Sequence, residues 1–218
     1  MTLKSDDPDV YRLRTFIETT YSPIPKDEQE RLIDSVANLI EQGYDKKQTV
    51  NSLLDHASKI IFKFFDFREI AIGLKSRKDG LYRYEILFGY RREIQEEFMR
   101  LAYTYEDMTS FDRFPHFQIG RLSSFNFAEG LPDQERHLYA LPYQLEAKRG
   151  SLDAFHEGDY IDTWINGPGK DLIGWIEMSS PVTKKLPPRM TLRWIEFIAS
   201  ILGSIISRRW KEEGASQK

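Results

Sequence analysis

The chain has 218 residues and a mass of 25.7 kDa, enough for one large domain or two small ones with a substantial core. Its 31 basic and 34 acidic residues give a net charge of −3, so no excess of positive charge favours binding to nucleic acid or to an anionic membrane. The sequence has no cysteine, which excludes disulfides, thiolate nucleophiles and thiolate metal sites. Aromatic residues make up 13%, and this raises the question of whether the rings serve only the core.

The ends of the chain bear on its location. Residues 1–9 lack the basic and apolar stretches of a secretory signal. No apolar run approaches the roughly 20 residues that span a bilayer, and the longest, residues 194–206, is interrupted by Glu196 and Gly203. We therefore expect a cytoplasmic protein with no membrane partner and no nucleic-acid partner.

Two amphipathic helices are expected near the N-terminus. Residues 1–45 form an extension that contains a possible short helix over 10–20 and a clear one over 27–41, with Gly43 placed to end it. Asp45 is expected to cap the next helix, over 46–64.

The period then changes from helical to alternating. Residues 68–75 and 81–88 flank a loop that contains glycine, which predicts a β-hairpin. In its second strand the alternation places four large residues on one face: Tyr82, Tyr84, Ile86 and Phe88. Helical spacing returns over 91–105.

The middle third, residues 106–157, is irregular and rich in aromatic side chains. Only residues 118–127 have the pattern of a strand. A long insertion of this kind inside a compact domain is either functional or disordered, and the many rings argue against disorder. We expect the insertion to fold over something.

The last third has a second hairpin and a long helix. The strands are expected over 159–165 and 172–179, the helix over 191–209, and a polar tail over 210–218.

This order of elements resembles the GAF domain family over residues 46–209. The resemblance is carried by Ser52-Leu-Leu-Asp-His-Ala-Ser-Lys-Ile-Ile-Phe with Glu69-Ile-Ala-Ile-Gly-Leu, and by Asp171-Leu-Ile-Gly-Trp-Ile-Glu-Met-Ser-Ser with the helix that begins near Thr191. It implies an α+β fold: a central antiparallel sheet of about six strands, terminal helices on one face, and a small-molecule pocket on the other. It also implies a sensory or regulatory module that dimerises through its terminal helices.

The sequence departs from three chemically defined branches of that family. The Asn-Lys-Phe-Asp-Glu pattern of the cyclic-nucleotide-binding members is absent. The bilin-attaching members and the methionine sulfoxide reductases use cysteine, which this chain lacks. We therefore expect no cofactor and no enzymatic activity.

The two C-terminal strands locate the candidate pocket. Alternation separates an aliphatic face, suited to the helices, from a face with aromatic and acidic residues that is turned towards the insertion. The second face offers aromatic walls and a few polar groups, as ligand sites do. The alternative is that these rings pack on the phenylalanines of the insertion and leave no cavity. The candidate ligand-binding residues on these strands are Tyr160, Asp162, Trp164, Trp175 and Glu177.

Four further candidates come from the insertion: Arg121, Phe125, Phe127 and Tyr143. The Arg121 guanidinium suits an anionic ligand, or an internal ion pair with Asp159, Asp162 or Glu177. The four histidines lack metal-ligand spacing, so we expect no metal site.

The C-terminal helix has an apolar stripe wider than one sheet face requires. We expect it to form a homodimer seam through Trp194, Ile198, Ile201 and Ile205 with the 27–41 helix. The alternative is that the 27–41 helix covers the stripe within the same chain.

Together these features predict a non-enzymatic, homodimeric small-molecule sensor or regulatory signalling domain. The alternative, from another class, is a protein–protein interaction scaffold with a collapsed pocket and no ligand. A third hypothesis, an enzyme that uses carboxylate, arginine or histidine chemistry in the pocket, lacks any recognisable constellation.

Overall fold

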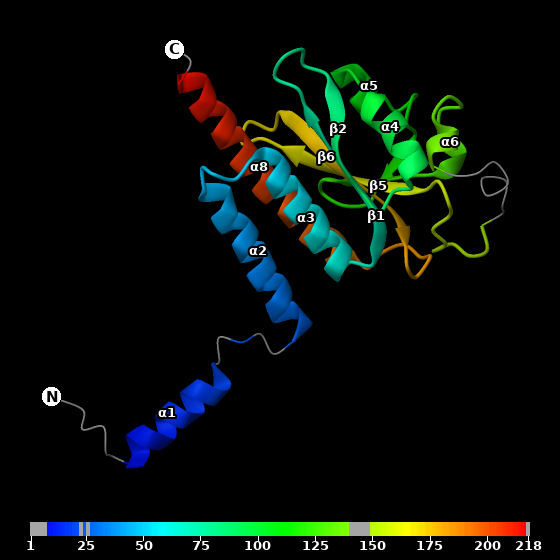
Figure 1. The fold of residues 1–218 in the computed structure, drawn as a ribbon. Coiled ribbons are helices and arrows are strands. Elements are labelled where there is room, and N and C mark those ends of the chain that lie inside the picture. The colour runs from blue at the N-terminus through cyan, green and yellow to red at the C-terminus, as the bar shows by residue number, and fades with distance from the viewer. Residues whose placement is uncertain (1–7, 22–23, 25–26, 140–148, 217–218) are drawn as a thin grey trace.

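The computed structural model describes residues 8–21, 24, 27–139 and 149–216 and is built on one antiparallel sheet. The six strands lie in the order β2-β1-β6-β5-β4-β3, with helices on both sides (Figure 1). This confirms the predicted α+β fold with a six-stranded sheet. The strands are β1 (Phe67–Lys75), β2 (Tyr82–Phe88), β3 (His116–Gln118), β4 (Ser123–Asn126), β5 (Tyr160–Asn166) and β6 (Leu172–Pro181).

Two long helices, α3 (Val50–Phe64) and α8 (Arg189–Ser216), cover one face of the sheet, and a third, α2 (Glu28–Tyr44), packs on both of them (Figure 1). Asp27 caps α2, since its side chain accepts a hydrogen bond from the backbone N–H of Glu30. Thr49 caps α3 in the same way through the N–H of Ser52, so the expected capping role of Asp45 is wrong. Asp45 instead follows the last turn of α2.

The main core lies between these helices and the sheet, and it is aliphatic. Leu39, Leu54, Ile72 and Ile198 are all fully buried in it. Gly43 does not end its helix as expected but lies buried within α2, where a Cβ would fall 2.4 Å from Cδ1 of Ile205. The glycine therefore lets α2 and α8 approach closely.

The second face is covered by short, irregular elements, namely α4 (Arg92–Arg100), α5 (Tyr105–Thr109), the 3₁₀ turn η1 (Ala128–Gly130) and α6 (Arg136–Tyr139). The helix expected over 91–105 is divided, because Tyr103 pairs in antiparallel fashion with Tyr82 beside the sheet. The strand expected over 118–127 is likewise two strands, β3 and β4, joined by a turn. The insertion thus folds over this face.

Two register shifts change the faces expected from alternation. Between β1 and β2 the pairing moves from Ile72–Ile86 to Gly73–Tyr84, which leaves Glu85 unpaired. Tyr82 and Tyr84 therefore face the insertion, while Ile86 and Phe88 pack in the aliphatic core. A second shift, between β5 and β6, likewise changes the faces of two neighbouring residues of β6. Leu172 faces the insertion, and Ile173 faces the aliphatic core.

The long helix α8 lies across the sheet and packs against α2 and α3. Its segment Arg189–Ala215 is long and apolar enough to cross a membrane, and 56% of its most apolar window is buried inside the protein. It continues through residues 210–216, where a polar tail was expected. Two residues of the predicted homodimer seam, Ile198 and Ile205, are buried within the chain, so that seam is wrong at both positions. At Ile205 the covering element is α2, through the close approach at Gly43.

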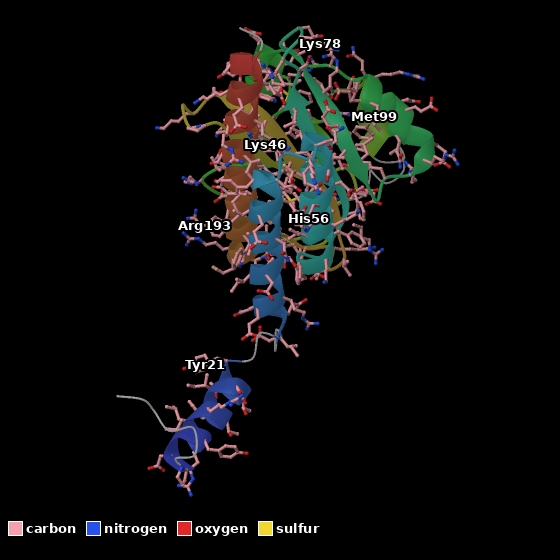
Figure 2. All side chains as sticks on the ribbon, turned by 60° about the vertical axis from the view of Figure 1, so that its left-hand side comes forward. Tyr21, Lys46, His56, Lys78, Met99 and Arg193 are labelled. Atoms are coloured by element: carbon pink, nitrogen blue, oxygen red, sulfur yellow. The ribbon has the colours of Figure 1, made fainter. Side chains whose placement is uncertain are left out.

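One helix stands apart from this core. Helix α1 (Pro8–Thr20) has no buried residue and projects beyond the end of α2, as two views show (Figures 1 and 2). Three of its large apolar side chains, Tyr11, Leu13 and Phe16, are more than half exposed. Helix α1 therefore takes no part in the core.

Candidate functional site

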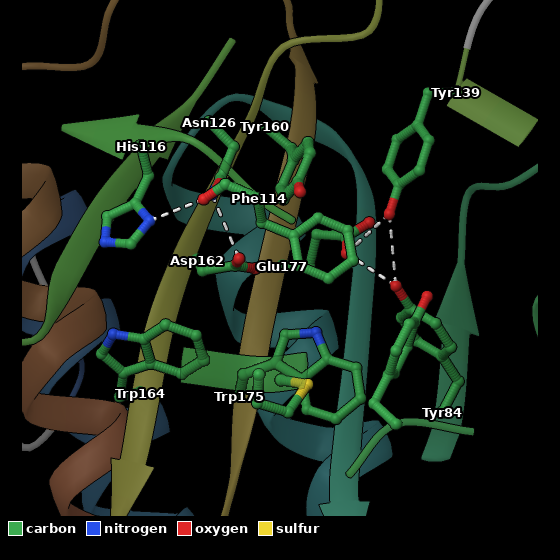
Figure 3. Close-up of a pocket in the computed structure, with 12 residues that line it drawn as sticks. Tyr84, Phe114, His116, Asn126, Tyr139, Tyr160, Asp162, Trp164, Trp175 and Glu177 are labelled. Atoms are coloured by element: carbon green, nitrogen blue, oxygen red, sulfur yellow. Dashed lines mark hydrogen bonds between the residues drawn. The ribbon is translucent and has the colours of Figure 1, made fainter. Parts of the chain in front are cut away.

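The insertion-covered face of the sheet carries a row of aromatic and acidic side chains. Asp162 on β5 lies directly opposite Glu177 on β6, and Trp164 lies directly opposite Trp175 (Figure 3). Because directly opposed residues in an antiparallel pair have their Cβ atoms about 4.5–5.5 Å apart, the two carboxyls are close neighbours, as are the two indoles. These four side chains form the floor of the site.

Gly73 on β1 makes room for the indole of Trp175. A Cβ at this position would lie 2.0 Å from the ring of Trp175. The ring can thus lie flat over its neighbouring strand, where it also packs edge-on against Tyr84 at 5.0 Å between centroids. The absence of a side chain at Gly73 therefore allows the Trp175 indole to occupy this position.

Side chains from the insertion, from β2 and from the segment between α4 and α5 surround the space above this floor. The ring of Tyr139 stacks on Tyr160 at 5.0 Å, and the ring of Tyr103 meets Trp175 edge-on at 6.3 Å. The cavity that remains measures about 30 Å³, or about 390 Å³ with the space that opens to solvent. The smaller volume holds about two water molecules. Its described lining residues are Tyr84, Tyr103, Met108, Phe114, His116, Asn126, Tyr139, Tyr160, Asp162, Trp164, Trp175 and Glu177.

The two carboxyls differ in their hydrogen bonds. Glu177 accepts from the hydroxyls of Tyr84 at 2.8 Å and Tyr90 at 2.9 Å. Asp162 accepts through Oδ2 from the side-chain amide of Asn126 at 3.1 Å. Its Oδ1 has no partner among the described residues, although the side chain is only 8% exposed. An orphan carboxylate oxygen in a buried cavity costs free energy, so it calls for an explanation.

The surroundings of the pair favour its protonated form. Burial raises the pKa of Asp162 well above its ordinary value, and the opposite carboxyl of Glu177 raises it further. Burial also raises the pKa of Glu177, to about 7, against the hydrogen bonds from Tyr84 and Tyr90, which lower it. At neutral pH the folded chain therefore does not hold two full negative charges side by side.

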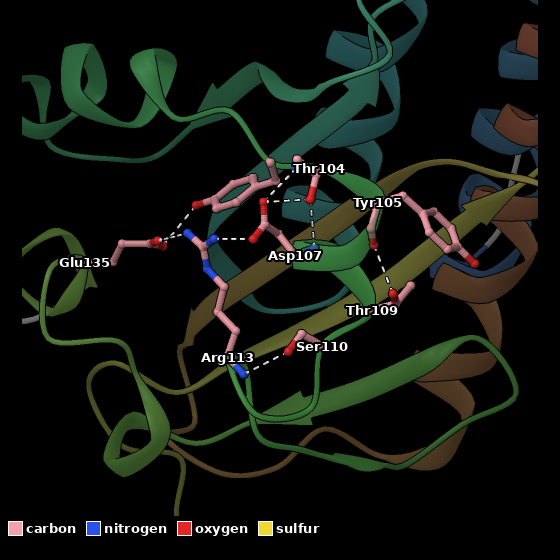
Figure 4. A network of polar contacts seen from close by, with 8 residues as sticks. Thr104, Tyr105, Asp107, Thr109, Ser110, Arg113 and Glu135 are labelled. Carbon is pink, nitrogen blue, oxygen red and sulfur yellow. Dashed lines mark hydrogen bonds and ion pairs between the residues drawn. The ribbon is translucent and has the colours of Figure 1, made fainter.

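A network around Arg113 holds the insertion over the cavity (Figure 4). The guanidinium of Arg113 donates hydrogen bonds to Asp107 in the first turn of α5 and, at 3.1 Å, to Glu135 just before α6. The same cation lies 5.4 Å from the ring centre of Tyr103, whose hydroxyl donates to Glu135 at 2.9 Å. Arg113 thus links α5, the segment before α6 and one aromatic wall of the cavity.

Five of the nine candidate residues come together at this cavity: Tyr160, Asp162, Trp164, Trp175 and Glu177. Their role in binding a ligand stays a prediction. Tyr143 lies outside the described residues.

The other three candidates lie elsewhere. Phe125 is buried on the helix-covered face, where its ring packs on Phe155 at 5.7 Å. Phe127 stacks on Phe117 and also packs on that side. Arg121 is exposed in the β3–β4 turn and reaches Ser200 of α8 at 3.4 Å, so the expected ion pairs with Asp159, Asp162 or Glu177 are wrong too. Phe125 faces the helices because it lies directly opposite Ile161 of β5, and Arg121 is displaced because the expected strand turns between β3 and β4.

The sequence interpretation missed several lining residues. Tyr84 could have been found, since it shares a face with Tyr82 in a regularly alternating strand. Tyr103, Phe114 and Tyr139 could not, because they reach the cavity from short irregular segments without any period. No group of three metal-binding side chains occurs among residues 8–21, 24, 27–139 and 149–216.

Comparison with known proteins bears on the fold alone. No protein-family model matches the sequence, and no curated protein matches it. The solved structure of a GAF domain/HD domain protein from Geobacter sulfurreducens superposes with a TM-score of 0.53 at 12% identity, covering 79% of this chain and 96% of that one. The chain has a GAF-like fold.

Two further solved structures agree. A GAF domain from a phosphoenolpyruvate-protein phosphotransferase of Coxiella burnetii gives a TM-score of 0.52 at 9% identity, covering 87% of this chain and 99% of that one. The chromophore-binding domain of the bacteriophytochrome RpBphP3 from R. palustris gives 0.51 at 15% identity, covering 87% and 65%. The identities are low, so the likeness extends to the GAF-like architecture and no further.

Proposed function

We propose that the chain is a non-enzymatic sensory or regulatory domain that binds a small molecule in the aromatic cavity. The observation that carries this proposal is the buried, unpartnered Oδ1 of Asp162 among aromatic walls. Apolar walls with a few convergent polar groups are typical of small-molecule sites. The position of the cavity, on the sheet face opposite the long helices, adds support through the GAF-like neighbours, one of which is a chromophore-binding domain.

One observation favours the alternative, an interaction scaffold without a ligand. The smaller volume holds only about two waters, so a larger molecule must also occupy the part that opens to solvent or displace the insertion. The Arg113 network resists displacement of the insertion, because it joins the segments that cover the cavity.

Native mass spectrometry of the full chain purified from its own host separates the two functions. A sensor is expected to carry an additional non-covalent mass that is lost on denaturation, and the apo chain should gain thermal stability from a component of a metabolite panel. A chain that carries no such mass and responds to no component supports the scaffold.

A matched pair of variants ties any ligand to the cavity. Trp164 lines the cavity and Trp194 lies on α8, and both indoles are partly exposed. Replacement of Trp164 by alanine is expected to abolish the thermal shift, while Trp194→Ala retains it. Equal loss in both variants would contradict binding in this cavity.

We also propose that the chain forms a homodimer through the surface of α8 that the rest of the chain leaves exposed. Trp194 and Ile201 remain partly exposed there, and Phe197 is 49% exposed beside them. Light scattering at tens of micromolar is expected to give the dimer mass, and Ile201→Glu the monomer mass. A wild-type monomer at that concentration would contradict the proposal.

A further inference from the structure

The other buried carboxylates of the described chain show what the cavity lacks. Asp159 is completely buried and bonds to the guanidinium of Arg149 at 2.7 and 2.8 Å. Two others also meet an arginine at 3.1 Å each: Glu135 with Arg113 and Glu196 with Arg193. In each case a cation compensates the charge that burial isolates from water.

Asp162 and Glu177 form the exception. Among the described lining residues no lysine or arginine faces them. The titratable groups around them are the hydroxyls of Tyr84, Tyr90, Tyr103, Tyr139 and Tyr160, the carboxyl of Glu135 and the ring of His116. His116 already contacts the carbonyl oxygen of Phe114 through Nδ1, at 2.8 Å. Two opposed carboxyls are therefore held in an aromatic chamber without a cation from these elements.

The two carboxyls are not equivalent as acceptors. Tyrosine hydroxyls donate to both oxygens of Glu177. Oδ1 of Asp162 receives no hydrogen bond, and neither does Oγ of Ser124, its cross-strand neighbour on β4. The cavity thus presents one free, buried acceptor next to a satisfied carboxyl, in a position where an N–H donor would complete the set.

We infer that the cavity binds a small organic cation that carries N–H donors, a protonated amine with an apolar body. The ammonium bonds to Oδ1 of Asp162 and is held by the negative charge shared with Glu177. The body lies against the indoles of Trp164 and Trp175 and extends into the part of the cavity that opens to solvent, where Trp164 is partly exposed. The faces of the indoles also attract a cation. This inference rests on the proposed function, because it names the ligand class of the same cavity.

The donor set favours an amine over a metal ion. The side chains at the cavity do not include three metal-binding groups close enough to hold one, within the part of the chain that the structure describes. Aromatic rings make up most of the wall and offer no lone pairs to a hard cation, whereas they pack well on carbon. An organic cation uses both the carboxyls and the rings.

Three probes with one framework test the inference. Phenethylamine, 2-phenylethanol and 3-phenylpropanoate share a phenyl ring and a two-carbon arm and differ in charge at its end. In calorimetric titrations of the full chain at pH 7.5 (roughly neutral), the amine is expected to bind at least about tenfold more tightly than the alcohol, and the carboxylate most weakly. An alcohol or a carboxylate that equals or exceeds the amine would overturn the inference.

The pH dependence offers a test on the wild-type chain that needs no variant. An ammonium ion stabilises ionised carboxyls, so its binding displaces protons from the pair. The affinity for phenethylamine is expected to rise between pH 6 and pH 8, with a binding heat that depends on the buffer because protons are released. An affinity independent of pH across this range would contradict the role of the carboxyls.

A pair of variants assigns the charge. Asp162→Asn keeps the shape and is expected to weaken amine binding at least about tenfold while leaving 2-phenylethanol unaffected. Glu93→Gln removes the same charge from an exposed position on α4 and should change neither. Equal amine affinity in wild type and Asp162→Asn would reject the assignment.

The failure of the inference can be told apart from the failure of the proposed function. If the alcohol or the carboxylate binds and Trp164→Ala abolishes that binding, the cavity is a ligand site but not a cation site. If none of the three probes binds, the cation inference falls, and the mass of a co-purified ligand then decides the proposed function separately.

Discussion

On the sheet face beneath α3 and α8, the buried side chains are mostly aliphatic, and these two helices pack directly on them. On the opposite face, the buried side chains are mostly aromatic and include the two opposed carboxyls of Asp162 and Glu177, and short irregular segments cover them. The aliphatic side chains of the first face need no hydrogen-bond partners once water is excluded. The second keeps an orphan acceptor and two acidic groups under its cover.

The difference shows which face carries stability and which carries chemistry. Aliphatic burial contributes about 25 cal/mol for each Å² removed from water, without any need for partners. Burial of a carboxyl next to another costs free energy, and a chain retains such an arrangement where it has a use. Four predictions follow this contrast, from the largest expected effect to the smallest.

Truncation on the helix-covered face should cost the most. Ile198→Ala removes a fully buried side chain from the aliphatic core, so we expect a loss of about 2–5 kcal/mol in the free energy of unfolding. Met190→Ala on the same helix is the control, with an expected change within about 0.5 kcal/mol because its side chain is 65% exposed. Urea titrations of both variants measure this. A loss for Ile198→Ala no larger than that for Met190→Ala would contradict the role of this face in stability.

The acidic pair should make the second face respond to pH in the opposite sense to a salt bridge. Both carboxyls have raised pKa values in the folded state, that of Glu177 being about 7. Their contribution to stability is therefore full below the unfolded-state values of about 4 and is lost progressively as the pH rises through the folded-state values. Asp162→Asn should differ least from wild type at about pH 4 and gain an increasing advantage over it as the pH rises to 8.

Urea titrations at several pH values, with Glu93→Gln as the control, measure this effect. A difference between Asp162→Asn and wild type that stays constant from pH 5 to pH 8 would contradict the raised pKa.

Loss of the Arg113 network should loosen the cover of the cavity. Arg113→Gln leaves the buried carboxyl of Glu135 with only the hydroxyl of Tyr103, so we expect a loss of about 1–2 kcal/mol and faster amide exchange in α5. Arg100→Gln is the control, because its ion pair with Glu96 is exposed and contributes about 0–1 kcal/mol. Unchanged exchange in α5 would show that Arg113 does not hold the lid.

Arg121 should have the smallest effect. Its side chain is exposed in the β3–β4 turn and contacts only α8 among its described partners, so Arg121→Ala should leave any cavity ligand bound with the same affinity. Calorimetry with the same ligand checks this. A weakened affinity would place Arg121 at the site after all.

Alternating and helical periods predicted the strands β1, β2, β5 and β6 and the long helices, while the six-stranded sheet was implied by the resemblance to the GAF family. The periods also identified five residues of the cavity, because β5 and β6 are long strands whose alternation is regular where these residues lie. Alternation failed where a single extra residue entered a strand: the unpaired Glu85 turned Ile86 and Phe88 to the other face. Such a bulge depends on pairing with a distant strand, which local sequence does not contain.

The lid of the cavity lay beyond sequence reasoning for a related reason. Tyr103, Phe114 and Tyr139 are placed by contacts with Arg113, Glu135 and the sheet, and not by any repeating pattern. Arg121 was misplaced because it lies in the turn between β3 and β4, and Phe125 because it lies opposite Ile161, on the helix-covered face. At Ile205 the helix α2 covers a position that was assigned to the dimer seam.

The four tryptophans of the chain divide between the two faces: Trp164 and Trp175 line the cavity, while Trp194 and Trp210 lie on α8. The protein therefore contains its own optical probe. With both α8 indoles replaced by phenylalanine, the remaining tryptophan emission arises beside Asp162 and Glu177. Its wavelength and intensity would then follow the entry of a molecule, or the loss of a proton, without any added label.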